Sequence, residues 1–279
     1  MPRTTTNHSP SLSPFERFQQ LARQFRLPTV AAEAVSRFVA AGHEEALSTL
    51  TDVFELEAED RQGRRVDRLR RAAHLPPGKT FETLDKARLP RPLVCRLQEL
   101  ARGAFADRAE NVLAFGLPGV GKSHAMCAVG HALVSQGRSV LFTPAFQLVQ
   151  QLLVAKRDLN LPRALRKLDL YEVLILDDIG YVQQNAEEVE VLFTLLSERY
   201  ERRSLVVTSN LVFSQWDQIF KNPMTTAAAI DRVVHHATIL EFNVPSYRTE
   251  QARTRRRSEA GGESLDLSPS TDPEQGQDL

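Results

Sequence analysis

The chain has 279 residues, 42% of them hydrophobic, and its 35 basic side chains equal its 35 acidic ones. This length predicts one large domain with a smaller appendage. No apolar run approaches the ~18 residues of a membrane helix, and the start lacks the apolar core of a secretion signal, so we expect a cytoplasmic protein. The two cysteines, Cys95 and Cys127, form no CxxC pair, which favours buried free thiols over a metal site or a disulfide.

The N-terminal part of the chain predicts a small helical domain. Residues 1–13 are polar and rich in Pro, Ser and Thr, so we expect them to be disordered. Apolar residues then recur at helical spacing from Pro14 until the Leu-Pro-Pro-Gly break at 75–78. We therefore predict a helical domain over 14–75 that contacts DNA or a partner, followed by a linker over 76–91.

The net charge of zero conceals a basic stretch. Residues 61–108 contain thirteen Lys or Arg and five Asp or Glu, a balance of 13 − 5 = +8. At its start, arginines at helical spacing predict a cationic helix face that binds nucleic acid. The alternative is a solvated basic face without a ligand. The candidate DNA-binding residues are Arg61, Arg64, Arg65, Arg68, Arg70 and Arg71.

The most informative motif is Gly-Leu-Pro-Gly-Val-Gly-Lys-Ser at 116–123, a complete G-x-x-x-x-G-K-[ST] phosphate loop. A strand over 111–115 and a helix over 123–135 flank it, as the motif requires, whereas a glycine turn that binds nothing usually lacks both flanks. Glycines let backbone N–H groups point at phosphate oxygens. Lys122 is expected to reach the β- and γ-phosphates, and Ser123 to bind Mg²⁺. The predicted nucleotide-binding residues are Gly116, Leu117, Pro118, Gly119, Val120, Gly121, Lys122, Ser123 and His124.

After the loop, strands and helices alternate. We predict further strands at 139–143, 172–176, 205–207 and 238–242, and helices at 145–157, 186–200 and 227–236. Alternation of this kind predicts an α/β domain over 92–250, with a five-stranded, mostly parallel sheet covered by helices on both faces. Residues 251–279 are rich in Ser, Gly, Pro and acidic side chains and are expected to form a disordered tail.

Polar residues stand where the predicted strands end. Asp177 follows a buried strand and is expected to join Ser123 at the metal ion, while Asp178 would act as a water-activating base. Two adjacent carboxylates would repel each other, which favours a cation there; a helix N-cap is the alternative, mainly for Asp178. Asn210, after the next strand, would hold the attacking water or a γ-phosphate oxygen.

Arg232 is the candidate for a cation that stabilises charge on the transferred phosphoryl group. A surface pair with Asp231 is the alternative. The adjacent His235 and His236 suggest a metal site at first, but neighbouring residues point to different faces of a helix, so we interpret them as packing and polar surface.

These motifs, with Leu-Ile-Leu-Asp-Asp-Ile-Gly, Val-Thr-Ser-Asn, Asp-Arg-Val-Val-His-His and Pro-Ser-Tyr-Arg (245–248), resemble the IstB-type transposition helper ATPases, relatives of the DnaC helicase loaders in the AAA+ class. The resemblance spans roughly residues 80–250. It implies ATP, Mg²⁺, a sheet with the phosphate-loop strand central, and a homo-oligomer in which Arg232 completes the neighbouring site. It also implies double-stranded DNA and a transposase as partners.

Two features depart from or strain the family pattern. Asp178 stands where glutamate is commoner, which bears on the rate of hydrolysis. No helical lid fits between residue 242 and the tail, so Arg248 is only a candidate second phosphate sensor.

Three other functions remain to be weighed. A helicase loader shares the ATPase core and differs in what its helical domain grips. A small-molecule kinase needs an arginine-bearing lid, for which the chain has no room after Phe242. A GTPase is disfavoured because the N-K-x-D guanine signature is missing.

Overall fold

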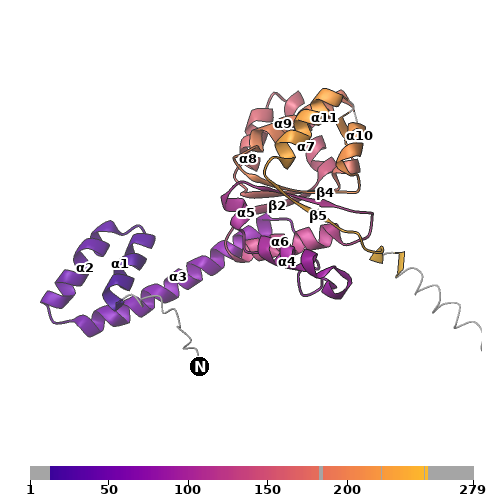
Figure 1. The fold of residues 1–279 in the computed structure, drawn as a ribbon. Coiled ribbons are helices and arrows are strands. Elements are labelled where there is room, and N and C mark those ends of the chain that lie inside the picture. The colour runs from indigo at the N-terminus through magenta and orange to yellow at the C-terminus, as the bar shows by residue number, and fades with distance from the viewer. Residues whose placement is uncertain (1–12, 182–184, 221, 248, 251–279) are drawn as a thin grey trace, which may run out of the picture. The chain divides into compact units, whose positions relative to one another are not determined.

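The structure is a computed structural model that describes residues 13–181, 185–220, 222–247 and 249–250 (Figure 1). It divides into two compact units, Met1–Arg71 and Ala72–Leu279. The predicted disordered segments, 1–13 except Ser13 and 251–279, lie outside the described residues. None of the described helices is long and apolar enough to cross a membrane.

The first unit consists of helices α1 (Pro14–Gln24), α2 (Pro28–Ala40) and most of α3 (Glu44–Ala72). The side chain of Ser13 caps the start of α1 in a capping box with Glu16. A small aromatic core holds the helices together: Phe18 is fully buried and its ring lies 5.1 Å from that of Phe54. This unit therefore has a core of its own, as its apolar spacing predicts.

The arginines of α3 that we propose for DNA binding are all exposed, but acidic residues accompany them. Arg61 pairs with Glu57 at 2.5 Å, and Arg64 pairs with Asp60 at 2.5 Å. These pairs are spaced i,i+4 along the helix. The acidic partners precede the basic stretch in sequence, so the helix face is less uniformly cationic than a count of residues from 61 onward suggests.

The second unit is built on a five-stranded sheet in the order β2-β3-β4-β1-β5, with every strand pair parallel. Its strands are β1 (Asn111–Phe115), β2 (Val140–Pro144), β3 (Val173–Asp177), β4 (Ser204–Ser209) and β5 (Ala237–Glu241). All five lie within one or two residues of the predicted ranges, which confirms the predicted sheet. β1, the strand before the phosphate loop, lies inside the sheet between β4 and β5, as the resemblance implies.

Helices cover both faces of the sheet (Figure 1). One layer contains α4 (Arg91–Leu100), α5 (Ala104–Asp107) and α6 (Lys122–Ser135). The other contains α7 (Ala145–Arg157), α8 (Leu161–Leu168), α9 (Ala186–Arg199), α10 (Asp217–Phe220) and α11 (Pro223–Val234). Short 3₁₀ turns η1 (Lys86–Arg88), η2 (Ile179–Tyr181) and η3 (Phe213–Gln215) complete the elements.

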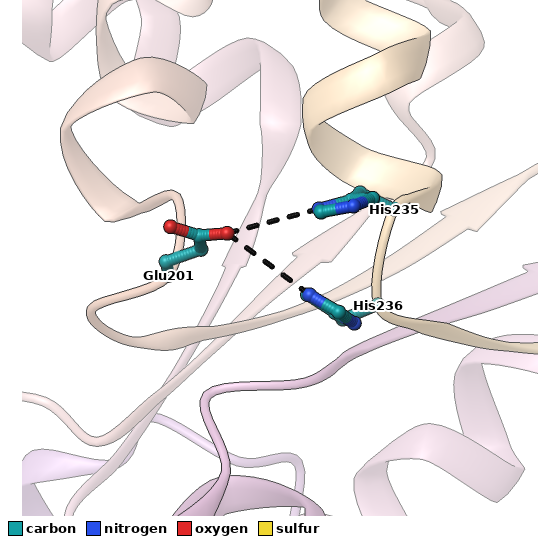
Figure 2. A group of neighbouring side chains, drawn as sticks. All are labelled: Glu201, His235 and His236. Carbon is teal, nitrogen blue, oxygen red and sulfur yellow. Dashed lines mark ion pairs between the residues drawn. The ribbon is translucent and has the colours of Figure 1, made fainter.

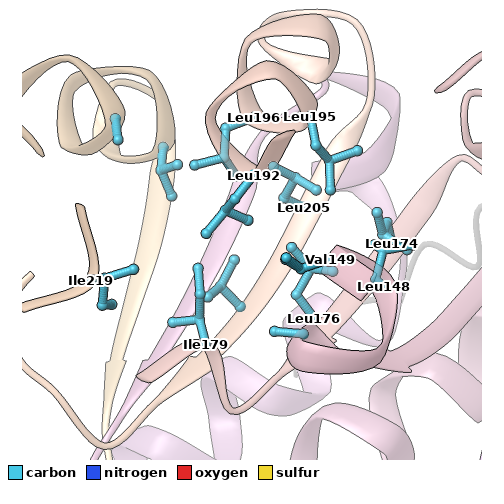
Figure 3. Close-up of a cluster of buried hydrophobic side chains, with 14 of the residues drawn as sticks. Leu148, Val149, Leu174, Leu176, Ile179, Leu192, Leu195, Leu196, Leu205 and Ile219 are labelled. Carbon is cyan, nitrogen blue, oxygen red and sulfur yellow. The ribbon is translucent and has the colours of Figure 1, made fainter. Parts of the chain in front are cut away.

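The main core lies between the sheet and the α7–α11 layer. Figure 3 shows leucines of β3, α7 and α9 interlocked there, including Leu174, Leu148 and Leu192, none of them more than 3% exposed. Burial of β3 on both faces explains its continuous apolar sequence. The C-terminal ends of β1, β3 and β4 are thereby held rigidly side by side, and the polar residues that follow them are fixed in position.

Two segments differ from expectation. Residues 76–91, which we expect to be a linker, are part of the second unit, where Leu84 and Leu89 are nearly fully buried. The prediction that both cysteines are buried is right for Cys127 on α6 but wrong for Cys95, which is exposed on α4. Cys95 lies on the side of α4 away from Leu93 and Leu97, which face the core.

Candidate nucleotide-binding site

The phosphate loop runs from the end of β1 to the start of α6. Its backbone requires glycine at two points. Gly116 has φ +151°, and a Cβ there would lie 2.7 Å from the carbonyl oxygen of Phe242. Gly121 has φ +99° and forms the N-cap of α6. The loop is thus folded tightly against the segment after β5, and the N–H groups at the start of a 14-residue helix border the concave side.

Lys122 is held inside the loop. Its side chain is only 5% exposed, and Nζ donates hydrogen bonds to the carbonyl oxygens of Gly116 (2.7 Å) and Leu117 (3.0 Å). A buried ammonium group needs such acceptors, because an uncompensated charge in the interior is costly. The loop therefore holds a positive charge beside its own backbone N–H groups, an arrangement that attracts phosphate.

A threonine that the sequence did not single out joins the two acidic residues after β3. Thr208, on β4, donates a 2.6 Å hydrogen bond from its hydroxyl to Oδ1 of Asp177. The hydroxyl oxygen of Thr208 in turn accepts a 2.9 Å hydrogen bond from the backbone N–H of Asp178. Asp178 has φ +57°, a left-handed conformation that occurs often at functional sites. The pair is therefore positioned by the neighbouring strand.

Asn210 follows β4 and faces the same region. Its Oδ1 is buried and has no hydrogen-bond partner among the described residues. Gly180 makes room for it, since a Cβ on Gly180 would lie 2.4 Å from that oxygen. Buried polar atoms are nearly always satisfied in folded proteins, so this oxygen is suited to a ligand or a water molecule.

The loop, Asp178 and Asn210 line one cavity of about 410 Å³, a volume typical of small-molecule sites. Asp177 is not among the residues that line it. The cavity is also lined by residues that sequence reasoning missed, namely Gly78, Lys79, Thr83, Leu84, Asp85, Arg88, Leu89, Val244, Pro245 and Tyr247. Most of these belong to the segment expected to be a linker.

His124 holds residues 76–91 at the wall of this cavity. Its Nε2 is 3.0 Å from the hydroxyl of Thr83 and 3.1 Å from the carbonyl oxygen of Thr80. The histidine stands in the first turn of α6, directly after the phosphate loop. It therefore connects the loop to a second wall of the cavity. No local pattern in the sequence signals this contact, because the partners are about forty residues apart.

Arg232 lies at the opposite end of β1 from the phosphate loop. It lines a separate hollow of about 160 Å³ together with Asn111, the first residue of that strand. Its guanidinium carbon lies 4.7 Å from the centre of the Phe193 ring, and Nη1 donates to the carbonyl of Ala228. A five-residue strand spans roughly 13 Å, so Arg232 is remote from the phosphate loop of its own chain.

The other predicted residues do not join this cavity. Arg248 lies outside the described residues. The six arginines of the basic stretch from Arg61 to Arg71 belong to the first unit. The structure therefore brings together the phosphate loop, Asp178 and Asn210, and leaves Arg232 apart.

Several solved structures share the fold of the second unit. The DnaI structure matches with a TM-score of 0.51 and 19% identity, covering 61% of this chain and 95% of that chain. The replication initiator DnaA bound to AMPPCP and single-stranded DNA matches with a TM-score of 0.53 and 15% identity, covering 66% and 56%. Identities this low show the fold alone, which is the α/β fold of the P-loop NTPases.

Relatives identified by sequence have higher identities to this chain than the solved structures do. A putative insertion sequence ATP-binding protein of Sinorhizobium fredii is 46% identical over 209 residues, 75% of this chain and 70% of the relative. The putative ATP-binding protein of insertion sequence IS5376 from Geobacillus stearothermophilus is 30% identical over 240 residues, 85% of this chain and 96% of the relative. The profile of the family described as IstB-like ATP binding protein matches residues 20–256. The chain therefore belongs to the IstB-like ATP-binding protein family.

Proposed function

We propose that the protein is a DNA-binding ATPase that assists the transposase of an insertion sequence by capturing or remodelling target DNA. The observation that carries this proposal is the meeting of the phosphate loop, Asp178 and Asn210 in one cavity. Family membership supports it, because relatives are named as ATP-binding proteins of insertion sequences.

The cavity fits ATP and Mg²⁺. The loop offers backbone N–H groups and Lys122 to the phosphates, and Ser123 lines the cavity with a hydroxyl oxygen that Mg²⁺ can take as a ligand. Asp177, which does not line the cavity, is proposed as the second protein ligand of the ion. When bound, Mg²⁺ neutralises part of the phosphate charge. Lys122 already makes hydrogen bonds to two loop carbonyls, so phosphate oxygens need only replace these acceptors.

Hydrolysis requires a base and a group that holds water. Asp178 lines the cavity and its backbone N–H is held by Thr208, which supports its carboxylate as the group that orients and activates a water molecule. Asn210 contributes a buried oxygen without a partner among the described residues, which suits it to accept a hydrogen bond from that water. Aspartate is shorter than glutamate by one methylene, so we expect slow hydrolysis.

The position of Arg232 supports action on a neighbouring protomer. It lies near the start of β1, whereas the phosphate loop follows the end of that strand. Arg232 is partly exposed, so it can approach the cavity of a second copy. An arginine supplied in this way accelerates phosphoryl transfer by about 10³-fold or more.

DNA binding is proposed for the arginines of α3. Their ion pairs with Glu57 and Asp60 are exposed, and exposed pairs are worth only about 0–1 kcal/mol, so DNA phosphates can displace the carboxylates. We expect binding of double-stranded DNA to weaken steeply with salt. A double Arg65→Ala, Arg68→Ala variant should have a smaller salt slope, whereas Arg37→Ala on α2, an equally exposed arginine, should not.

The decisive test measures ATP binding and duplex DNA binding by the full chain and by Lys122→Ala. We expect the wild type to bind Mg-ATP and to bind DNA more tightly with a non-hydrolysable analogue. Lys122→Ala should lose both properties. DNA binding that ignores the nucleotide, or capture of a replicative helicase in place of a transposase, contradicts the proposal.

Mixing two inactive variants tests the shared site. Lys122→Ala retains Arg232, and Arg232→Ala retains the phosphate loop. If Arg232 acts across an interface, each variant alone hydrolyses ATP poorly, and the mixture regains part of the activity. Full activity of Arg232→Ala alone, or no recovery on mixing, shows that the arginine does not act in this way.

A further inference from the structure

A cluster of two histidines and one glutamate lies outside the nucleotide cavity (Figure 2). Nδ1 of His235 is 3.7 Å from Oε1 of Glu201, and Nε2 of His236 is 4.0 Å from the same oxygen. The two imidazole rings lie 4.1 Å apart, centre to centre. The expectation that the histidines point to different faces of a helix is therefore wrong, because α11 ends at Val234.

The backbone holds both sides of this cluster in place. The carbonyl oxygen of His236 accepts a 2.8 Å hydrogen bond from the backbone N–H of Asn111 on β1. Glu201 stands in the turn after α9 with φ +56°, and the N–H groups of Arg202 and Arg203 both donate to the carbonyl of Arg199. The three side chains thus come from two segments whose backbones are held by hydrogen bonds.

We propose that Glu201, His235 and His236 bind a divalent metal ion of the zinc class. Two imidazole nitrogens and one carboxylate oxygen form a donor set suited to Zn²⁺. Their ligand atoms all lie within 4.8 Å of one another, whereas ligands about 2.1 Å from one tetrahedral ion lie about 3.4 Å apart. Small rotations of exposed side chains close this difference.

Two arginines and a hollow lie beside the cluster and affect how well it can bind an ion. Arg108 and Arg232 line the adjoining hollow and repel a cation. Arg108, however, donates two hydrogen bonds to the carboxylate of Glu110, at 2.6 and 2.8 Å, and the negative charge of that carboxylate offsets part of the repulsion. The hollow itself gives room for a water molecule as a fourth ligand.

Tyr200 competes for one ligand atom. Its hydroxyl lies 2.7 Å from Nδ1 of His235, the nitrogen nearest to Glu201. The hydroxyl donates to this nitrogen in the tautomer that carries the imidazole proton on Nε2. Metal binding replaces that hydrogen bond. The change Tyr200→Phe should therefore leave the affinity for Zn²⁺ unchanged or increase it.

The site has a consequence for α11. Arg232 lies one turn before the two histidines, so an ion that joins them to Glu201 restrains the end of the helix that carries this arginine. The metal site itself does not depend on the proposed function, because its test needs neither nucleotide nor DNA.

The test titrates Zn²⁺ into the metal-free full chain by calorimetry, with Mg²⁺ in excess to saturate any magnesium site, and repeats the titration with Co²⁺ followed by absorption. We expect one site, and at least tenfold weaker binding for Glu201→Gln, His235→Gln and His236→Gln. His43→Gln and Cys95→Ser serve as controls, since both residues are exposed and lie elsewhere.

A second readout guards against variants that fold poorly. Zn²⁺ should raise the Tm of the wild type and of Tyr200→Phe, and leave that of Glu201→Gln unchanged, while all have similar Tm values without metal. The proposal is overturned if the wild type binds no Zn²⁺, if the three ligand variants bind as tightly as the wild type, if Cys95→Ser abolishes binding, or if Tyr200→Phe does.

Discussion

Thr208 fixes Asp177 through a 2.6 Å hydrogen bond between the threonine hydroxyl and Oδ1 of the aspartate. The two residues lie on neighbouring parallel strands, β4 and β3, so the bond connects the ends of both. Because the same hydroxyl accepts the N–H of Asp178, one side chain holds the carboxylate of Asp177 and the backbone of Asp178. The arrangement of the site therefore depends on a residue that contributes no charge.

Replacement of Thr208 by valine keeps the shape of the side chain and removes both hydrogen bonds. We expect ATP hydrolysis to slow by about 10²-fold, since displacement of a reacting group by about 1 Å has an effect of that size. ATP affinity, which depends mainly on the phosphate loop, should change little. Steady-state kinetics and nucleotide titration check this, and Thr208→Ser should restore the rate. Equal kcat values for Thr208→Val and the wild type exclude this positioning role.

Gly180→Ala tests the position of Asn210. A Cβ at residue 180 would lie 2.4 Å from Oδ1 of Asn210, so the amide must leave its observed position. We expect hydrolysis to fall at least tenfold while ATP binding persists. Gly63→Ala on α3 is the control, because a Cβ there meets nothing within 4 Å. It should leave hydrolysis intact. A Gly180→Ala variant that hydrolyses ATP at the normal rate would show that Asn210 is not needed at its observed position.

Arg199 stabilises the backbone near the first residues of β3 and β4. It is 1% exposed and donates hydrogen bonds to the carbonyls of Leu168 (2.9 Å), Tyr171 (3.0 Å) and Ser204 (3.1 Å). Burial lowers its pKa to about 10, so it remains charged near neutral pH. Arg199→Leu leaves these carbonyls without a donor and should reduce the free energy of unfolding by about 3–5 kcal/mol.

Urea unfolding at neutral pH measures this loss. Arg202→Ala is the matched control. Arg202 is a nearby arginine whose guanidinium pairs with Asp169 at 3.1 Å, and its side chain is 60% exposed. Its removal should reduce the free energy of unfolding by less than about 1 kcal/mol. Similar losses for the two variants would mean that the buried contacts of Arg199 contribute no more than a surface ion pair.

The buried thiol of Cys127 should make the free energy of unfolding depend on pH in the alkaline range. Burial raises the pKa of its thiol from 9.0 to about 12. A group whose pKa is higher in the folded state stabilises the fold below its unfolded pKa and loses this contribution as the pH rises through the folded pKa. The free energy of unfolding should therefore decline between about pH 9 and 12, and less steeply in Cys127→Ala than in Cys95→Ala.

Thiol alkylation gives an independent measurement for the same residue. Near pH 8, iodoacetamide should modify Cys95 in the native protein and both cysteines in urea, since Cys95 is exposed and Cys127 is buried on the helix after the phosphate loop. Rapid modification of Cys127 without denaturant would show that this helix opens readily, against its tight packing.

The sheet and the phosphate loop were predictable because their signals are local. A run of apolar residues such as 173–176 indicates a buried strand by itself, and the loop motif needs only its own eight residues and two flanks. The resemblance to the IstB-type family, carried by motifs in order, is confirmed by the family profile and by the sequence relatives.

Contacts between distant segments were not predictable. The role of His124 depends on Thr80 and Thr83, about forty residues earlier, and Thr208 meets Asp177 only because β4 lies beside β3. The orientation of His235 and His236 depends on where α11 ends, and helix ends are difficult to locate from sequence. Domain limits, the DNA contacts and the role of Arg232 stay predictions.

β5 has a further consequence for the behaviour of the protein at high concentration. Among the described residues it pairs only with β1, so its outer backbone groups form an exposed edge. Such edges invite aggregation by strand addition. The strand is only five residues long, ends at the exposed Glu241, and is followed closely by Pro245, all of which hinder a foreign strand from docking. Aggregation by strand addition at β5 is therefore disfavoured, and we expect any ordered assembly to use other surfaces.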